Sequence, residues 1–216
     1  VCLALKKLGM SLRYIQVYLD KRTPELFLDL LEQQENKLIE YINEMQHIHE
    51  LIKSYQTFTT DALNADYDEI KVEYLAETRL LLSANLENTT SKDFASFMND
   101  YTTFIESNQI ITGEFVGVMT KIENIINNNV TNYSYLFTTT NNSTQQTFVK
   151  KAGNYLCGYH HGSENKLYDS YLKMLNYASK HKITLGQYAF EEYIISDICE
   201  RSKNHYLTRI TIEIAS

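Results

Sequence analysis

The stretch QYAFEEYII, Gln187–Ile195, has the composition of a β-strand with two adjacent glutamates at its centre. Its aromatic and β-branched residues favour an extended backbone. Side chains alternate between the two faces of a strand, so Glu191 shares a face with Tyr193, and Glu192 shares the other with Phe190. Neither face is polar. Whichever face packs into the protein, one carboxylate is predicted to be buried with it, which is costly without a partner.

The chain around this strand has 216 residues, of which 44% are hydrophobic and 22% charged. This is typical of a globular protein with one large domain or two small ones. The net charge of -7 offers no overall basic surface for nucleic acid, although residues 1–22 carry a local excess of lysine and arginine. The sequence starts at Val1, already in a helical pattern, so we expect part of the natural protein to precede it.

Cysteines, tyrosines and apolar runs limit the class of protein further. Three scattered cysteines exclude a disulfide framework and favour the reducing cytoplasm. Neither a signal peptide nor an apolar run long enough to span a membrane is present, so no membrane association is predicted. The 17 tyrosines, with no tryptophan, suit a ligand pocket, but codon bias explains them equally well.

The first quarter of the chain is helical in pattern. Gly9 and Ser11 predict a turn and a helix cap, and Thr23-Pro24 predicts the start of a long helix that ends near Tyr55. Apolar residues recur along it at heptad spacing, namely Leu31, Leu38, Met45 and Ile52, with Gln34, Tyr41 and Ile48 in the second register. This indicates a coiled-coil dimerisation helix over residues 23–55, the alternative being a helix docked on its own domain.

Residues 56–68 are predicted to be a connector without regular period. From residue 69 to residue 216 the pattern is strand, helix, strand, strand, and this order occurs twice. The predicted fold class is therefore α+β, with a long N-terminal helix followed by a duplicated β-α-β-β domain around a shared cavity.

Two other kinds of site find little support in the sequence. Cys157, His160, His161 and Glu164 are close in sequence, but the two histidines point to opposite faces of a strand, so no metal site is predicted. No glycine-rich phosphate loop is present either. We therefore predict no cofactor, no metal ligand and no catalytic residue.

The adjacent glutamates favour binding over catalysis. Because they point in opposite directions, Glu191 and Glu192 cannot clamp one substrate as a general acid and base. A single buried carboxylate among aromatic rings is suited to an organic cation. The alternative is that the buried glutamate pairs internally with Arg209 or Lys173, or that a bulge turns both glutamates outward.

Residues 5–42, LKKLGMSLRYIQVYLDKRTPELFLDLLEQQENKLIEYI, resemble the MerR family of transcription regulators. Residues 1–22 are similar to the helix pair that closes the family's winged-helix DNA-binding domain, and the long helix is similar to its dimerisation coiled coil. The segment that the family places before this pair is absent. The resemblance implies a homodimer that binds DNA through that missing region and acts on RNA polymerase.

Residues 69–216 are similar to the GyrI-like effector-binding domain of the multidrug-sensing, BmrR-like members of that family, most clearly from Ala152 onward. The resemblance places Phe190 and Glu191 at the base of a drug pocket, with Phe190 where the family has tyrosine. Tyr206 matches a pocket tyrosine, although Asn204 and His205 precede it instead of an acidic residue. The segments expected to line the pocket add Tyr155, Tyr168 and Tyr171.

The resulting prediction is a ligand-sensing transcription regulator that is not an enzyme and binds an aromatic or lipophilic, cationic small molecule. One alternative is a GyrI-like hydrolase that uses the pocket glutamate on small electrophiles. A metal-sensing regulator is disfavoured because no cysteine lies between Cys2 and Cys157.

Overall fold

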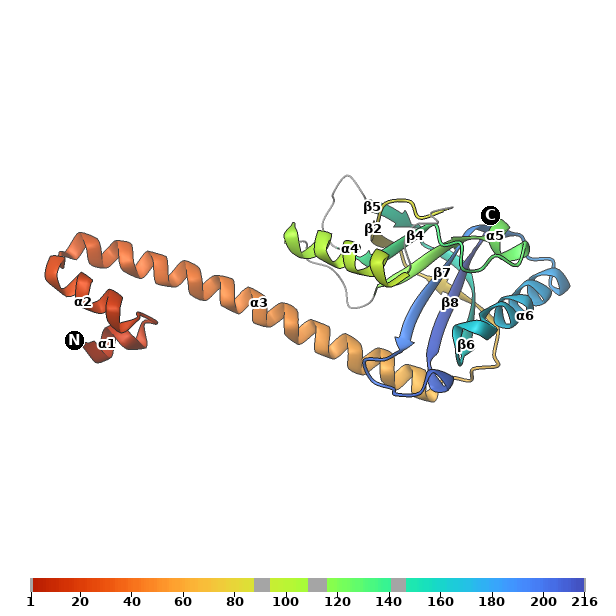
Figure 1. Cartoon of the computed structure of the whole chain (residues 1–216), viewed down its shortest axis with the longest axis horizontal. Helices are drawn as coiled ribbons and strands as arrows, with labels where there is room; N and C mark the ends of the chain where they lie inside the picture. The colour runs from red at the N-terminus through yellow and green to blue at the C-terminus, as the bar shows by residue number, and fades with distance from the viewer. Residues whose placement is uncertain (1, 88–93, 109–115, 141–146, 216) are drawn as a thin grey trace. The chain divides into compact units, whose positions relative to one another are not determined.

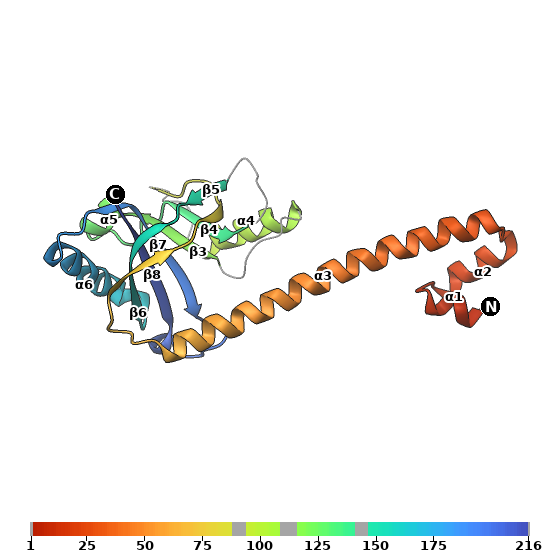
Figure 2. The ribbon, with the colours of Figure 1, turned by 180° about the vertical axis from the view of Figure 1, so that it is seen from behind.

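The computed structural model describes residues 2–87, 94–108, 116–140 and 147–215. The chain divides into two compact units, Val1–Lys53 and Ser54–Ser216, which are described separately (Figures 1 and 2). Among the described residues, no helix combines the length and the apolar character that crossing a membrane requires.

The first unit is helical, and its caps follow the sequence pattern. Helix α1 (Cys2–Lys7) ends at a turn in which Gly9 has a φ of 85°, a conformation that favours glycine. Helix α2 (Leu12–Lys21) begins after Ser11, whose Oγ accepts a hydrogen bond from the backbone N–H of Tyr14 at 3.3 Å. Four buried side chains hold the helices of this unit together, namely Leu5, Met10, Ile15 and Leu30.

Helix α3 (Pro24–Asn64) is longer than the sequence predicted. It starts as expected, because Thr23 Oγ1 caps it by accepting a hydrogen bond from the N–H of Leu26 at 3.2 Å. It continues past Tyr55, so residues 56–64 of the predicted connector are helical. Tertiary packing explains the difference, because Phe58 and Ala62 contact a cluster of the second unit that includes Ile194 and Leu207. This contact was not visible in the local periodicity.

The second unit is built on one antiparallel sheet of eight described strands, in the order β1-β6-β8-β7-β3-β4-β2-β5. The strands are β1 (Lys71–Leu75), β2 (Thr78–Leu82), β3 (Gly117–Lys121), β4 (Tyr135–Thr139), β5 (Thr147–Lys150), β6 (Gly153–His161), β7 (Leu185–Ile195) and β8 (Leu207–Ile214). The helices are α4 (Phe94–Ser107), α5 (Ile122–Ile126) and α6 (Leu167–Lys180), with short 3-10 turns η1 (Glu164–Lys166) and η2 (Lys203–His205).

The predicted α+β class and the duplication are confirmed, with one additional strand in each half. Each half has the order strand, strand, helix, strand, strand: the first half extends from β1 to β4 and the second from β5 to β8. Helix α5 is a short addition to the first half. The first strand of each half pairs with the second strand of the other half, β1 with β6 and β5 with β2. Strands β3 and β7 join the halves at the centre of the sheet. This exchange of edge strands ties the two halves into one sheet.

The strand register assigns the central side chains to two faces. Glu191 lies beside Val118 of β3 and Ile210 of β8, so these three residues share a face. Val118 packs in the cluster that contains α4, and Ile210 packs in the cluster that contains α5 and α6. Helices α4 and α6 therefore cover the same face of the sheet, which we call the helix face, and α6 runs beside β6 (Figure 1).

The opposite face, which we call the inner face, is the inside of a strong curl. Lys150 of edge strand β5 donates a hydrogen bond to Thr211 Oγ1 of β8 at 2.9 Å, although five strand spacings separate these strands in the sheet order. In a flat sheet that separation would be about 24 Å. The sheet therefore bends until its edge meets its middle, and its curvature can be followed in Figure 2. A cluster of aromatic and aliphatic side chains fills the curl.

Gly117 allows the sheet to close around Glu191, and we predict that it tolerates no side chain. A Cβ at this position would lie 2.4 Å from the backbone oxygen of Glu191 and 2.5 Å from Phe137 Cζ. Gly117→Ala is therefore expected to lower the free energy of unfolding by about 1–3 kcal/mol through overpacking, measured by urea denaturation. Gly153→Ala is the matched control, because nothing lies within 4 Å of its Cβ position. Equal effects of the two variants would contradict this account.

Candidate functional site

The Glu191 carboxyl group is the most strongly buried acid among the described residues, with 0% of the residue exposed. Strand β7 carries it at the centre of the sheet, where the neighbouring strands contribute apolar side chains on both sides. Burial raises the pKa of Glu191 to about 8, because the charged form loses its hydration. Near neutral pH the group is therefore mostly protonated in the folded protein.

Tyr171 of helix α6 is the hydrogen-bond partner of this carboxyl group among the described residues. Its hydroxyl donates a hydrogen bond to Glu191 Oε1 at 2.6 Å, and neither residue has exposed surface. The hydrogen bond opposes the effect of burial on the pKa of Glu191 but does not outweigh it. Within the described residues, Glu191 Oε2 has no hydrogen-bond partner. A buried oxygen without a partner is costly, and it leaves one acceptor free for a ligand.

Two more phenol groups lie on this side of the sheet. Tyr193 follows Glu191 by two residues on the same strand, and its buried hydroxyl has no hydrogen-bond partner among the described residues. Burial, with the nearby charge of Glu191, raises the pKa of Tyr193 well above its usual range. Tyr133 packs in the same cluster as Tyr193, and its ring centre lies 5.4 Å from that of Phe94 at the start of α4, with the two rings tilted by 59°. A carboxyl group and three phenols therefore gather between α4 and α6.

The alternative that Glu191 pairs internally with Arg209 or Lys173 does not match the ion pairs of the described residues. Arg209 instead contacts Glu73 at 2.9 Å and Glu192 at 4.0 Å, both on the inner face. Lys173 lies 3.1 Å from Asp68 at the surface. Glu192 is thus the glutamate with a cationic neighbour, and Glu191 is the one buried on the helix face. Alternation along the strand predicted that one of the two is buried without deciding which.

The six residues predicted to form the pocket do not all come together. Glu191 and Tyr171 are in contact, and Tyr168 packs at the edge of the α6 core. Phe190 and Tyr155 point to the inner face, where they share a cluster. Grouping Phe190 with Glu191 was therefore incorrect, because adjacent residues of a strand face opposite sides.

Tyr206 lies outside the cluster as well. It precedes β8 and is four residues before Ile210, the partner of Glu191, which corresponds to about 13 Å along an extended chain. Tyr193 and Tyr133 were not among the predicted residues. Alternation along β7 would have identified Tyr193, whereas Tyr133 depends on how β3 pairs with β4 and on the position of α4.

The Cys157–Glu164 segment forms no metal site in the structure. Cys157 is buried on the inner face, whereas the ring nitrogens of His160 contact Ser170 Oγ at 2.9 Å and the carbonyl of Ser163 at 3.0 Å. In the part of the chain that the structure describes, no three histidine, cysteine or acidic residues are grouped as metal ligands would be. The imidazole of His160 serves a structural hydrogen-bond network.

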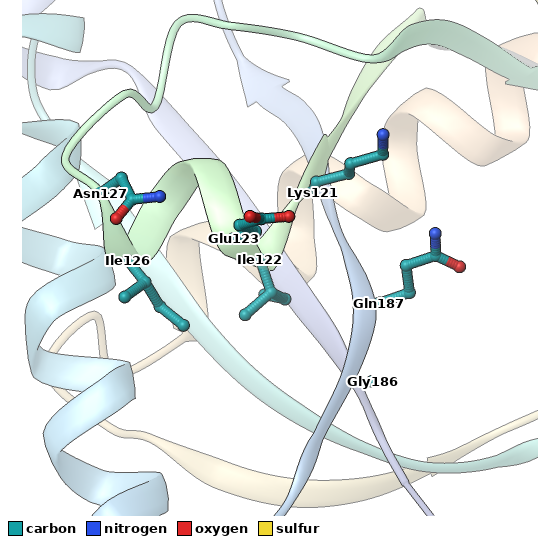
Figure 3. Close-up of a pocket in the computed structure, with 7 residues that line it drawn as sticks. All are labelled: Lys121, Ile122, Glu123, Ile126, Asn127, Gly186 and Gln187. Atoms are coloured by element: carbon teal, nitrogen blue, oxygen red, sulfur yellow. The ribbon is translucent and has the colours of Figure 1, made fainter.

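A hollow of about 580 Å³ lies where α5 follows β3, beside Gly186 and Gln187 of β7 (Figure 3). It contains Glu123 and Ile126, which are exposed, and Lys121, whose Nζ already lies 2.9 Å from Glu87. The hollow includes none of the predicted pocket residues and no buried charged group. We therefore place the candidate site at Glu191 and not here.

The chain is similar to a known regulator over nearly its whole length. Over 97% of its length it is 22% identical to the multidrug-efflux transporter 2 regulator of Bacillus subtilis strain 168, of which the match covers 77%. The chain is therefore similar to this regulator over both of its units. No family profile matches the sequence.

Solved structures show the same fold. The cryo-EM structure of the EcmrR-DNA complex in EcmrR-RPo matches with a TM-score of 0.50 and 12% identity, covering 100% of this chain and 81% of EcmrR. The crystal structure of the EcmrR C-terminal domain matches with a TM-score of 0.51 and 11% identity, covering 68% of this chain and 98% of that domain. Glu191 lies in the second unit of the chain, Ser54–Ser216.

The raised pKa of Glu191 predicts a pH-dependent effect of Glu191→Gln on stability. The unfolded chain keeps the ordinary value of 4.5, so between about 4.5 and about 8 the folded state binds more protons. Wild-type stability therefore falls as the pH rises through this window. Glutamine has the same shape without the charge, so the variant should gain on the order of 4 kcal/mol relative to wild type between about pH 5 and about pH 8.5.

The measurement is urea denaturation at both pH values, with Glu192→Gln as the control. Glu192 is half-buried and has Arg209 as its neighbour, so its variant should stay within about 1 kcal/mol of wild type at both pH values. A difference between Glu191→Gln and wild type that does not change with pH would show that Glu191 is ionised in the folded state.

Proposed function

We propose that this chain is a MerR-like, ligand-sensing transcription regulator whose second unit is a GyrI-like domain that binds an aromatic or lipophilic, cationic small molecule at Glu191. The observation that carries the proposal is the fully buried carboxyl group with one oxygen that has no partner among the described residues. The phenols of Tyr171, Tyr193 and Tyr133 surround it with ring faces and hydroxyl groups.

The charge of the ligand follows from the state of the carboxyl group. Burial holds Glu191 mostly protonated near neutral pH, and a cation placed beside it would favour the ionised form. The attraction acts in a region of low dielectric, and the neighbouring ring faces add cation–π attraction. An anionic ligand would oppose ionisation, and a neutral one would gain only a hydrogen bond. A cationic ligand is therefore favoured, and its binding would release a proton.

Access to the site links binding to conformation. Because Glu191 and Tyr171 have no exposed surface, a ligand can reach the carboxyl group only if α6 or another covering segment moves. The ligand thus binds an opened arrangement of the domain more tightly than the closed one, which is the condition for shifting an equilibrium. In the intact regulator we propose that this shift changes how the protein acts on promoter DNA and RNA polymerase in the cytoplasm.

Helix α3 supports the proposed homodimer. Along the heptad positions Leu38, Met45 and Ile52 each expose about half of their surface, with Tyr41 in the second register. Such a row of exposed apolar side chains on a 41-residue helix is suited to a second helix of the same kind. A monomer in analytical ultracentrifugation at micromolar concentration would contradict a coiled-coil dimer.

Binding of a lipophilic cation tests the proposed site directly. The absence of tryptophan allows tyrosine fluorescence to be used, and tetraphenylphosphonium is expected to quench it on binding. Glu191→Gln should weaken binding about ten-fold or more, because a desolvated charge contact is lost, whereas Glu192→Gln should leave affinity within about two-fold. If Glu192→Gln weakens binding and Glu191→Gln does not, the ligand occupies the inner face.

The second candidate function is hydrolysis of a small electrophile by Glu191 and a neighbouring phenol. It is favoured by the same hydrogen bond from Tyr171, which resembles an acid–base pair. Incubation with a bound compound distinguishes the two functions. Recovery of the compound unchanged supports a sensor, whereas turnover that Glu191→Gln abolishes supports an enzyme.

A further inference from the structure

The inner face of the sheet contains a second buried charge, the ammonium group of Lys150. Only 7% of this residue is exposed, on strand β5 at the edge of the sheet. Its Nζ lies 4.5 Å from the ring centre of Phe190 and 5.1 Å from that of Tyr155, and it donates a hydrogen bond to Thr211 Oγ1 at 2.9 Å. These three contacts hold the amine at the centre of the curl.

The charge of Lys150 is only partly compensated. Among the described residues, no carboxylate oxygen lies within 4.0 Å of its Nζ. The carboxylates of Glu192 and Glu73 contact Arg209 instead. Burial lowers the pKa of Lys150, while the more distant charge of Glu192 acts in the opposite direction. An ammonium group has three donors, of which Thr211 takes one. A buried, incompletely satisfied cation calls for an explanation, as Glu191 does.

Lys150 also lines a cavity of about 220 Å³. Its walls include Lys150 and the rings of Phe148, Tyr155, Tyr188 and Phe190. Phe148 lies 6.2 Å from Tyr188 and 6.3 Å from Phe190 between ring centres, so the rings already form one packed aromatic group. The volume exceeds the roughly 30 Å³ of one water molecule several-fold and suits a ligand the size of a single substituted ring.

We propose that this cavity is a second ligand site, which binds a small aromatic carboxylate through the ammonium group of Lys150. The carboxylate would use donors of Lys150 that Thr211 leaves free, in charge-assisted hydrogen bonds away from bulk water. The ring of the ligand would pack against Phe148 and Phe190. A cationic ligand is disfavoured here, because it would meet a buried positive charge.

The site differs in charge preference from the one at Glu191 and does not depend on it. Phe190 and Glu191 are consecutive residues of β7, yet one belongs to the aromatic cavity and the other to the helix face. The same strand thus separates a buried amine on one side from a buried carboxyl group on the other. Lys151 and Glu213 also line the cavity, and their opposite charges cancel. The net positive charge of the cavity lining therefore comes from Lys150.

A purely structural role of Lys150 is the competing explanation, because its hydrogen bond to Thr211 connects the edge strand β5 to β8. Both roles predict that Lys150→Met lowers stability. Only the binding role predicts that the unmodified protein distinguishes a carboxylate from an uncharged molecule of the same shape. The decisive comparison therefore uses the wild-type chain first.

The experiment is an NMR titration of the full chain with benzoate, benzamide and benzylammonium. Benzoate is expected to bind saturably and to shift the backbone amides of Lys150, Tyr155 and Phe190. Benzamide lacks the charge and should bind at least about ten-fold more weakly than benzoate. Benzylammonium should not shift the amide signals of these residues. Equal shifts by benzoate and benzamide, or benzoate shifts elsewhere in the domain only, would overturn the proposal.

Two variants complete the test. Lys150→Met should abolish saturable benzoate binding, whereas Lys180→Met, at an exposed position that does not line the cavity, should leave affinity within about two-fold. Circular dichroism shows whether each variant is folded. If Lys150→Met is unfolded, the comparison of benzoate with benzamide on the wild-type chain decides the question alone. A folded Lys150→Met variant that binds benzoate as wild type does would overturn the proposal.

Discussion

Burial of the Glu191 carboxyl group is the constraint on which the rest of the second unit depends. Glu191 lies where β7 pairs with β3 and β8. The backbone oxygen of Glu191 is so close to Gly117 that a side chain at position 117 would collide with it. An apolar residue of similar size would be less costly at this position. The buried carboxyl group therefore lowers the stability of the fold but provides a hydrogen-bond acceptor for a ligand. Functional sites commonly reduce stability in this way.

The curl of the sheet gives the domain two interiors and not one. On the helix face, α4 and α6 enclose Glu191 with phenols, and on the inner face the edge strand β5 brings Lys150 against the aromatic cluster. Each interior holds one ionisable group whose pKa burial shifts toward neutrality, the acid upward and the amine downward. In each interior, a ligand of opposite charge would favour the ionised form of the buried group.

Local sequence signals predicted the features that depend on neighbours in the chain. Alternation along β7 placed Glu191 and Glu192 on opposite faces, and Ser11 and Thr23 cap the helices they were expected to cap. Features that depend on distant pairing were missed. The end of α3 is held by Ile194 and Leu207, and Lys150 meets Thr211 only because the sheet curls. Phe190 was placed in the pocket by the family resemblance, whereas alternation along β7 puts it on the face opposite Glu191.

The protonation state of Glu191 tests the central claim most directly. In protein with 13C-labelled glutamate, the carboxyl carbon of residue 191, assigned by its absence from Glu191→Gln, can be followed by NMR as the pH is raised. A midpoint near 8 is predicted for the empty domain, with a lower midpoint once a lipophilic cation is bound. A midpoint near the ordinary value of 4.5 in the empty domain would contradict the account, because the carboxyl group would then already be charged and compensated without a ligand.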